Sequence, residues 1–218
     1  MLVRGFVGGR WMTIHTRQNA LGSSGGEVRK RLPEAVLVLA GGTAKRLGGV
    51  SKPDYKIGPL RLIDIVLAEI DRTGFAGRIV AVAPNELAVR EGVELTLEDP
   101  PHGGPLAGLG AGVAALADMP GSTLVAVMTC DAPLSPRLWG ELCIEIGKVD
   151  AAVPVSADAE AWPQYLHGCY RLRALRDLSI YRDVSIRRGF ATITAAHVVD
   201  TNWCCMDVDT PADAKDMA

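Results

Sequence analysis

Short, uniformly apolar segments alternate along this chain with segments whose apolar residues recur every three or four positions. Uniformly apolar runs of about five residues are typical of strands buried on both faces, and the wider spacing is typical of amphipathic helices. The predicted strands span residues 36–40, 78–83, 93–97, 124–128 and 151–155. The predicted helices span residues 62–70, a stretch beginning near 105, and about 136–147. This alternation predicts a mostly parallel sheet covered by helices.

Four glycine-rich or polar segments directly follow predicted strands. They are residues 39–53, 84–85, 98–112 and 130–133. In sheets of this kind, ligands bind beyond the carboxyl ends of the strands, where the strand order reverses. We therefore expect these four segments to meet at one edge of the sheet and to form a single site.

The first of these segments, LAGGTAKRLGGVSKP, predicts a site for a nucleoside triphosphate. Gly41 and Gly42 turn the chain after a buried strand, which exposes backbone N–H groups to anionic oxygens. Arg46 and Lys52 suit a polyphosphate, whose charge must be neutralised while it reacts. The P-loop and dinucleotide-binding glycine motifs are both absent from this segment. An ordinary glycine turn with solvated cations is the alternative.

Carboxylates near the same edge are candidates for holding a metal ion. Asp131 follows a buried strand and could bind Mg²⁺, which needs only one or two protein carboxylates beside phosphate oxygens. It could equally cap a turn. Asp207 and Asp209 flank Val208 in a predicted strand, and a spacing of two places both on one face. Two such carboxylates repel unless a cation lies near them, although Asp209 could instead cap a helix beginning at Pro211.

Glycines also crowd the start of the helix predicted near residue 105. They are Gly103, Gly104, Gly108, Gly110 and Gly112. Each glycine inside a helix costs about 1 kcal/mol relative to alanine, so their number needs a reason. Either a ligand comes close, most directly at Gly108, or the helix packs closely on the sheet. Asn85 and Asp99 lie near this edge and could read a base or a ribose hydroxyl, or serve as turn residues.

Composition limits the classes of function. A length of 218 residues suits one α/β domain, and a net charge of −2 gives no bulk attraction to nucleic acid or anionic membranes. The sequence lacks the run of about 18 apolar residues that predicts a transmembrane helix. Five cysteines without C-x-x-C spacing predict reduced thiols and a cytoplasmic protein. Residues 1–34 are rich in Gly, Ser and Arg, so we expect a disordered basic leader before a domain spanning 35–218.

Five segments, in order, resemble motifs of the MobA-like nucleotidyltransferase family. Residues 39–53 resemble its LAGGxSxRMGxDK signature, and residues 98–113 resemble its D-x-x-x-G-P-L-A-G-L segment. Residues 130–133 resemble the C-D-x-P metal motif. Residues 162–171 resemble P-Q-P-L-H-x-x-Y-R, with Tyr165 where proline is usual. The end of the chain, at 207–211, resembles the closing N-x-N-T-P or D-I-D-T-P.

The resemblance implies a three-layer α/β sandwich of the glycosyltransferase-A-like (nucleotide-diphospho-sugar transferase) fold. It also implies Mg²⁺-dependent nucleotidyl transfer with loss of pyrophosphate. The molybdenum cofactor guanylyltransferases are the nearest match, and they transfer GMP from GTP to the terminal phosphate of molybdopterin. The expected partners are therefore GTP or another NTP, a phosphorylated acceptor, and proteins of molybdoenzyme maturation.

The family pattern also implies roles for individual residues. The nucleotide would be bound by Leu39, Ala40, Gly41, Gly42, Lys52, Asn85, Asp99 and Gly108. Lys52 would neutralise the α-phosphate and Arg46 the outer phosphates, while Asp131 and Asp209 would hold Mg²⁺. His167 could contact an anionic acceptor, although a lone histidine is more often structural.

At the closing motif Asp207 and Asp209 replace a pair of asparagines, which leaves the acceptor open. Several alternatives to a molybdenum cofactor guanylyltransferase therefore stay under consideration. They are a molybdenum cofactor cytidylyltransferase, a phospholactate guanylyltransferase, a sugar-phosphate nucleotidyltransferase and a non-enzymatic nucleotide-binding module.

Overall fold

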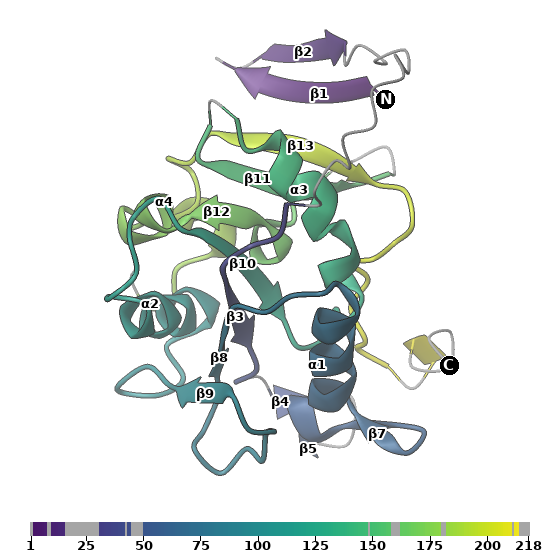
Figure 1. Ribbon diagram of the computed structural model, residues 1–218, viewed down its shortest axis with the longest axis vertical. Coiled ribbons are helices and arrows are strands. Elements are labelled where there is room, and N and C mark those ends of the chain that lie inside the picture. Colours follow the sequence, from purple (N-terminus) through teal and green to yellow (C-terminus); the bar gives the residue numbers. More distant parts are fainter. Residues whose placement is uncertain are drawn as a thin grey trace.

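A seven-stranded sheet forms the centre of the protein (Figure 1). The computed structural model describes residues 2–7, 10–15, 31–41, 43–44, 50–147, 149–157, 162–179, 182–210 and 212–213. The strands are β3 (Ala35–Leu39), β8 (Arg78–Val82), β9 (Val93–Thr96), β10 (Leu124–Thr129), β11 (Ala151–Ser156), β12 (Cys169–Arg171) and β13 (Ala195–Asp200). Their order is β13-β11-β12-β10-β3-β8-β9. Within the described part, β12 alone runs antiparallel to its neighbours β10 and β11.

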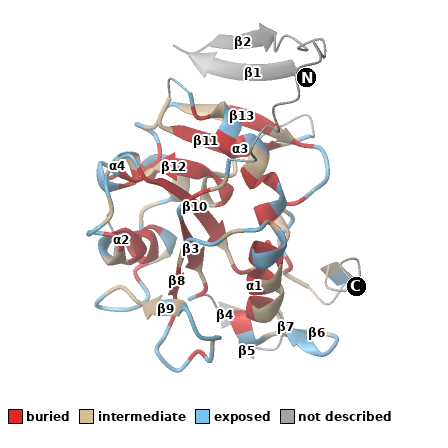
Figure 2. Cartoon of the chain, in the orientation of Figure 1, coloured by how far each residue is buried: buried red, intermediate tan, exposed pale blue. Residues whose placement is uncertain are grey.

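Helices cover both faces of this sheet, which confirms the predicted mostly parallel α/β architecture in three layers. The helices are α1 (Leu62–Arg72), α2 (Pro105–Ala115), α3 (Trp139–Glu145), α4 (Leu172–Arg176) and α5 (Ile186–Gly189). Alternate residues of β3 point to opposite faces. Val36 and Val38 pack in the same cluster as α1 and α3, and Ala35 and Leu37 pack in the cluster of α2 and α4. Buried residues accordingly concentrate in the central strands (Figure 2).

Several short elements are absent from the sequence-based prediction. They are β12, β13, α4, α5, the antiparallel pairs β4 (Thr43–Ala44) with β5 (Val50–Ser51) and β6 (Lys56–Ile57) with β7 (Leu60–Arg61), and the 3-10 turns η2 (Lys52–Asp54), η3 (Ser135–Leu138) and η4 (Tyr165–His167). Most of these elements have only two to four residues, too few to show a pattern, and the apolar residues of β13 are interrupted by His197. The η3 turn also takes up the first residues of the helix predicted from about 136.

The strand predicted around Asp207 and Asp209 is wrong. The chain leaves β13 at Asp200, whose carboxylate accepts hydrogen bonds from the backbone N–H groups of Asn202 and Cys205. The following residues run as irregular backbone beside the end of β10. Val208 N–H donates to the carbonyl oxygen of Asp131 at 2.8 Å, which brings the closing segment next to Asp131. The two carboxylates thus reach this edge without belonging to a strand.

The amino-terminal segment contains a hairpin where the sequence predicts no ordered structure. Strands β1 (Leu2–Val7) and β2 (Arg10–His15) pair in antiparallel register, and β1 lies beside β13 (Figure 1). Their valine, isoleucine, phenylalanine and tryptophan residues favour strands. Residues 16–30 lie outside the described residues. The domain boundary at residue 34 stays a prediction.

Deleting residues 1–30 is expected to leave the melting temperature and the activity nearly unchanged. The deletion keeps the contacts that anchor the start of β3. Glu34 N–H donates to Leu124 O at 2.8 Å, and Glu34 O accepts from Arg78 N–H at 3.2 Å. Calorimetry of the shortened and full chains would measure the difference. A shortened protein that melts many degrees lower, or loses solubility, would make the leader part of the fold.

A buried carboxylate ties α1 to the η3 turn. Glu69 is 3% exposed, and Arg137 donates to its two oxygens from Nε at 2.9 Å and from Nη2 at 3.0 Å. Arg72 forms a further ion pair with it. The hydrogen bonds from Arg137, followed by the contact with Arg72, hold the pKa of Glu69 below its ordinary value despite the opposing effect of burial.

Replacing Glu69 by glutamine is expected to lower the free energy of unfolding by about 1–3 kcal/mol at pH 7. A lowered pKa in the folded state contributes stability above the ordinary value of 4.5, and this stability is lost as the pH falls through the folded pKa. The difference between the variant and the wild type should therefore shrink at acid pH. Urea unfolding at pH 7 and pH 3.5 would measure it, with the exposed Glu86→Gln as the control. An equal difference at both values would contradict the assignment.

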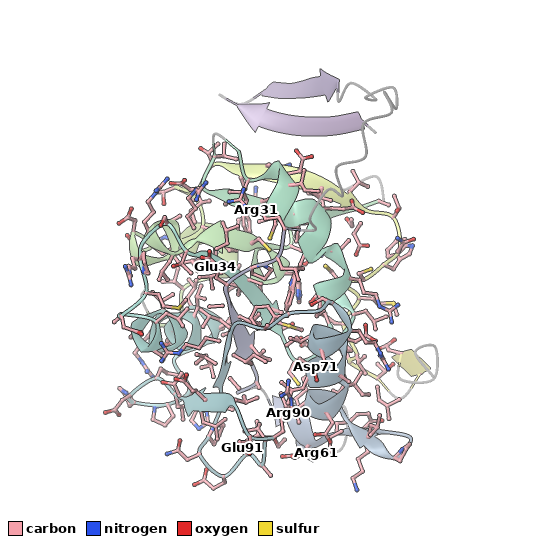
Figure 3. The ribbon with its side chains drawn as sticks, in the orientation of Figure 1. Arg31, Glu34, Arg61, Asp71, Arg90 and Glu91 are labelled. Carbon is pink, nitrogen blue, oxygen red and sulfur yellow. The ribbon has the colours of Figure 1, made fainter. Side chains whose placement is uncertain are left out.

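An ion pair on the surface joins two of the residues labelled in Figure 3. Arg90 and Asp71 form this pair at 2.7 Å, which ties the segment after β8 to the end of α1. Among the described residues, no helix has the length and apolar character needed to cross a membrane.

Candidate active site

Two adjoining cavities lie at the carboxyl ends of the central strands. The first has a volume of about 620 Å³ and is lined by all four segments that the sequence places at this edge. The lining residues include Leu39, Ala40, Gly41, Lys52, Pro84, Glu98, Gly104, Gly108, Thr129 and Asp131. The second cavity has a volume of about 960 Å³ and shares Pro105, Thr129 and Asp131 with the first. Asp131 therefore lies in the wall between the two.

The backbone after β3 is held by its neighbours up to the point where it enters the first cavity. Ala40 N–H donates to Val82 O at 2.9 Å, and Leu39 O accepts from Cys130 N–H at 3.0 Å. Gly41 follows as an exposed residue in the cavity wall. Gly42 and Arg46, both predicted to bind phosphate, lie outside the described residues.

Lys52 contacts two carboxylates that are far from it in the sequence. Its Nζ donates to Asp131 Oδ2 at 2.7 Å and to Asp209 Oδ1 at 2.6 Å, across 79 and 157 residues of chain. Burial alone would lower the pKa of Lys52, but the hydrogen bonds to Asp131 and then Asp209 raise it. Burial also favours the neutral form of Asp131 and by itself would raise the pKa of this carboxyl group. The contact with Lys52 instead holds the pKa of Asp131 below its ordinary value. Lys52 and Asp131 are therefore both charged at neutral pH.

The position of Lys52 depends on the junction between η2 and α1. Arg61 lies just before α1 and donates from Nη1 to Asp54 Oδ1 at 3.1 Å and from Nη2 to Asp64 Oδ1 at 2.7 Å (Figure 3). Tyr55 N–H donates to Lys52 O at 3.1 Å. The short turn that carries Lys52 is thus fixed to the first turn of a buried helix.

Asp131 has the properties expected of a ligand for a hard cation. Its Oδ1 atom is buried and has no hydrogen-bond partner among the described residues. Buried polar atoms usually have partners, so an orphaned carboxylate oxygen at a cavity wall is unusual. Within the described part, no three His, Cys, Asp or Glu side chains gather in a metal-binding arrangement. Asp131 and Asp209, which both contact Lys52, would offer two carboxylates to Mg²⁺, which completes its coordination with water and phosphate oxygens.

Asp207 lies in the wall of the second cavity. Asp207 is exposed to solvent, and the desolvation that it does feel in the cavity wall, together with the neighbouring carboxylates of Asp131 and Asp209, raises its pKa above the ordinary value. The sequence pairs Asp207 with Asp209, whereas the structure gives the two residues different surroundings. Asp209 contacts Lys52, and Asp207 faces the second cavity.

The polar residues nominated for base or ribose recognition lie away from the first cavity. Asn85 and Asp99 are exposed and do not line it, and Asp99 borders a shallower hollow on the outer side of α2. Glu98 lines the first cavity instead, and its Oε1 accepts from Gly103 N–H at 3.1 Å. Sequence reasoning missed Glu98. The sequence shows Glu98 directly before Asp99, but their spacing does not tell which of the two carboxylates points into the cavity.

The structure supports close packing of α2 on the sheet, while the approach of a ligand to Gly108 stays a prediction. A Cβ atom at Gly112 would lie 3.1 Å from Val82 Cγ2 and 3.2 Å from Leu37 Cδ2, so this glycine allows the helix to pack closely on the sheet. Gly108 lines the first cavity, and a Cβ atom there would lie 3.6 Å from Glu98 Oε2. A side chain at residue 108 would therefore enter the space beside Glu98.

The second cavity is walled by aromatic and histidine side chains. The Arg187 guanidinium lies 5.2 Å from the ring centroid of Trp162, and both residues line the cavity. Burial lowers the pKa of His167 to about 4, and its Nε2 lies 3.4 Å from Thr129 Oγ1. His167 is thus neutral at physiological pH, which favours a structural role over binding of an anion by charge.

The protein is thus an α/β sandwich with two adjoining cavities at the carboxyl ends of its parallel strands. The model of the MobA-like NTP transferase domain matches residues 36–211, and the chain belongs to this family. It is therefore a nucleotidyltransferase with the glycosyltransferase-A-like fold, as the motifs predict. No curated protein matches the chain.

Solved structures agree with this fold. One is molybdopterin-guanine dinucleotide biosynthesis protein A from Archaeoglobus fulgidus, which is 24% identical with a TM-score of 0.62, covering 84% of this chain and 95% of that one. Another is Rv0371c from Mycobacterium tuberculosis H37Rv, at 16% identity and a TM-score of 0.64, covering 85% of this chain and 97% of that one. Its homolog from Mycobacterium sp. strain JC1 is 19% identical with a TM-score of 0.65, covering 84% and 93%.

Proposed function

We propose that this protein is an Mg²⁺-dependent guanylyltransferase that transfers GMP from GTP to a phosphorylated acceptor, with molybdopterin as the acceptor, and releases pyrophosphate. The observation that carries the proposal is the cluster of Lys52, Asp131 and Asp209, in which Asp131 lies in the wall shared by two cavities. Nucleotidyl transfer needs two substrates that meet at one phosphorus atom. Two adjoining cavities with charged groups at their junction meet this need.

The first cavity would hold the nucleotide. Leu39, Ala40, Gly41 and Gly42 would contact it through backbone groups, and Gly108 would leave room beside it. Glu98 is the candidate for the base because guanine presents two adjacent N–H donors, which suit a carboxylate. Asn85 and Asp99 do not line this cavity, so they would contact the base or the ribose only at its rim.

Lys52 would neutralise the negative charge of the α-phosphate where the two cavities meet, and Arg46 would neutralise the outer phosphates. Asp131 and Asp209 would hold Mg²⁺, whose chemistry when bound is to neutralise phosphate charge. The acceptor phosphate is already an anion and needs no strong general base. Positioning and charge neutralisation would supply most of the rate.

The second cavity would hold the acceptor. The indole of Trp162 and the guanidinium of Arg187 offer flat surfaces, which suit a planar ring such as a pterin. We place the reaction in the cytoplasm, in agreement with five free cysteines, and we expect the product to pass to proteins of molybdoenzyme maturation.

A second candidate is transfer to another phosphorylated acceptor. Asp207 in the second cavity favours it, because this carboxylate stands where the family motif often has asparagine. Phospholactate and sugar phosphates are the alternatives, and a cytidylyltransferase would use CTP with molybdopterin.

Incubating the protein with Mg²⁺, each NTP in turn and each acceptor, and measuring pyrophosphate, tests both candidates. The highest rate is expected with GTP and molybdopterin. Pyrophosphate release with CTP or with another acceptor would favour the corresponding alternative. Nucleotide binding without turnover on any acceptor would favour a nucleotide-binding module.

A further inference from the structure

We propose that Lys52 closes the cation site formed by Asp131 and Asp209, so that a divalent metal enters only together with the phosphates of a nucleotide. This inference rests on the proposed function and concerns the order in which ligands bind. It arises from one observation. The ammonium group of Lys52 lies between the two carboxylates that would otherwise bind the metal.

The geometry makes Lys52 a close substitute for a metal ion. Its Nζ lies 2.7 Å from one Asp131 oxygen and 2.6 Å from one Asp209 oxygen, distances typical of charge-assisted hydrogen bonds. The Lys52 side chain is 15% exposed, and that of Asp131 is 21% exposed. The pair of Lys52 and Asp131, in such restricted contact with water, interacts more strongly than surface pairs do. Asp209, whose side chain is 47% exposed, adds a weaker second contact.

Metal alone cannot readily displace this lysine. A poorly hydrated charge that is left without any partner is strongly unfavourable. If a metal ion took both carboxylates, the Lys52 ammonium would lose its two anions while its turn stays fixed through Arg61. It would then need another anion within reach of the same side chain.

A nucleotide supplies that anion. Lys52 lines the first cavity, so its ammonium can move from the carboxylates to a phosphate without leaving the cavity wall. The carboxylates then lose a cation at the moment the metal arrives with the phosphates. The exchange leaves every charge with a partner, whereas either ligand alone leaves one without.

The first experiment measures Mn²⁺ binding to the full chain without nucleotide, by the electron paramagnetic resonance signal of free Mn²⁺. Lys52→Met removes the ammonium and keeps the length of the side chain. It should bind Mn²⁺ at least ten times more tightly than the wild type. Adding Asp131→Asn to this variant should return the affinity to the wild-type level. Lys56→Met, at an exposed lysine nearby, is the matched control and should bind as the wild type does.

The second experiment compares the binding of GTP and of preformed Mn–GTP to the wild type by calorimetry. The proposal expects Mn–GTP to bind more tightly. Tight binding of Mn²⁺ to the wild type without nucleotide would overturn the proposal, and this test stands even if no Lys52 variant folds. Lys52→Gln serves as a second neutral variant if the Met variant is unfolded by circular dichroism.

The outcomes separate the two levels of inference. If Mn–GTP binds to the wild type but neither neutral Lys52 variant gains affinity for Mn²⁺, then the closing role of Lys52 is wrong and the proposed function stands. If the wild type binds neither GTP nor Mn–GTP, the proposed function itself fails.

Discussion

Replacing Lys52 by alanine is expected to lower turnover at least about a hundredfold while the protein stays folded. Lys52 is a cation in the wall of the first cavity, beside Asp131, and its backbone is held by the turn that Arg61 anchors to α1. Charge on the transferred phosphate grows as pyrophosphate leaves. Loss of one preorganised contact to such charge typically costs about 3–4 kcal/mol of transition-state stabilisation. Steady-state pyrophosphate release with saturating NTP and acceptor would measure the effect.

The matched control is Lys56→Ala, which removes an exposed lysine four residues further along the chain. It should keep wild-type turnover. Circular dichroism of both variants would show whether the fold is intact. Near-wild-type turnover in a folded Lys52→Ala protein would contradict the assignment of Lys52 to the reaction.

Replacing Asp131 by asparagine is expected to abolish metal-dependent activity and to leave the free energy of unfolding within about 1 kcal/mol of the wild type. Amide oxygen is a weaker ligand than carboxylate for a hard cation, so the loss should appear in activity. Stability should change little because Lys52 keeps Asp209 as a charged partner. The backbone oxygen of Asp131, which accepts from Val208 N–H, is also unaffected.

Activity against Mg²⁺ concentration and urea unfolding would be measured on the same preparation. The alternative role of Asp131 is to cap the turn after β10. An Asp131→Asn protein that is strongly destabilised, but whose folded fraction keeps full activity, would support that alternative.

The pattern of apolar residues predicts the long elements well. An unbroken apolar run identifies a strand that is buried on both faces, and apolar residues at helical spacing identify a helix with one buried face. Strand β10 has five consecutive buried residues, and α1 repeats its buried residues at helical spacing. The pattern fails for β12, which has three residues and is placed by hydrogen bonds to β10 and β11 rather than by its own sequence. Tertiary pairing decides such elements.

The sequence likewise predicts one part of the candidate site and misses another. Strand-end position predicts that Lys52 and Asp131 share one edge, and the structure brings them to 2.7 Å. Asp209 joins them, but through irregular backbone held by Val208 rather than through the predicted strand. Glu98 instead of Asp99 lines the first cavity, because the direction in which each side chain leaves the loop depends on local dihedral angles that spacing does not report.

The antiparallel strand β12 affects how this protein can diverge during evolution. It separates β11 and β13 from the block of β10, β3, β8 and β9. Most of the first cavity comes from segments that follow this block, whereas most of the second comes from residues 162–167 and 186–197. Mutations after residue 160 can therefore reshape the second cavity while the first keeps its walls. A new acceptor can then be gained by changing only the part of the gene that encodes the residues after 160.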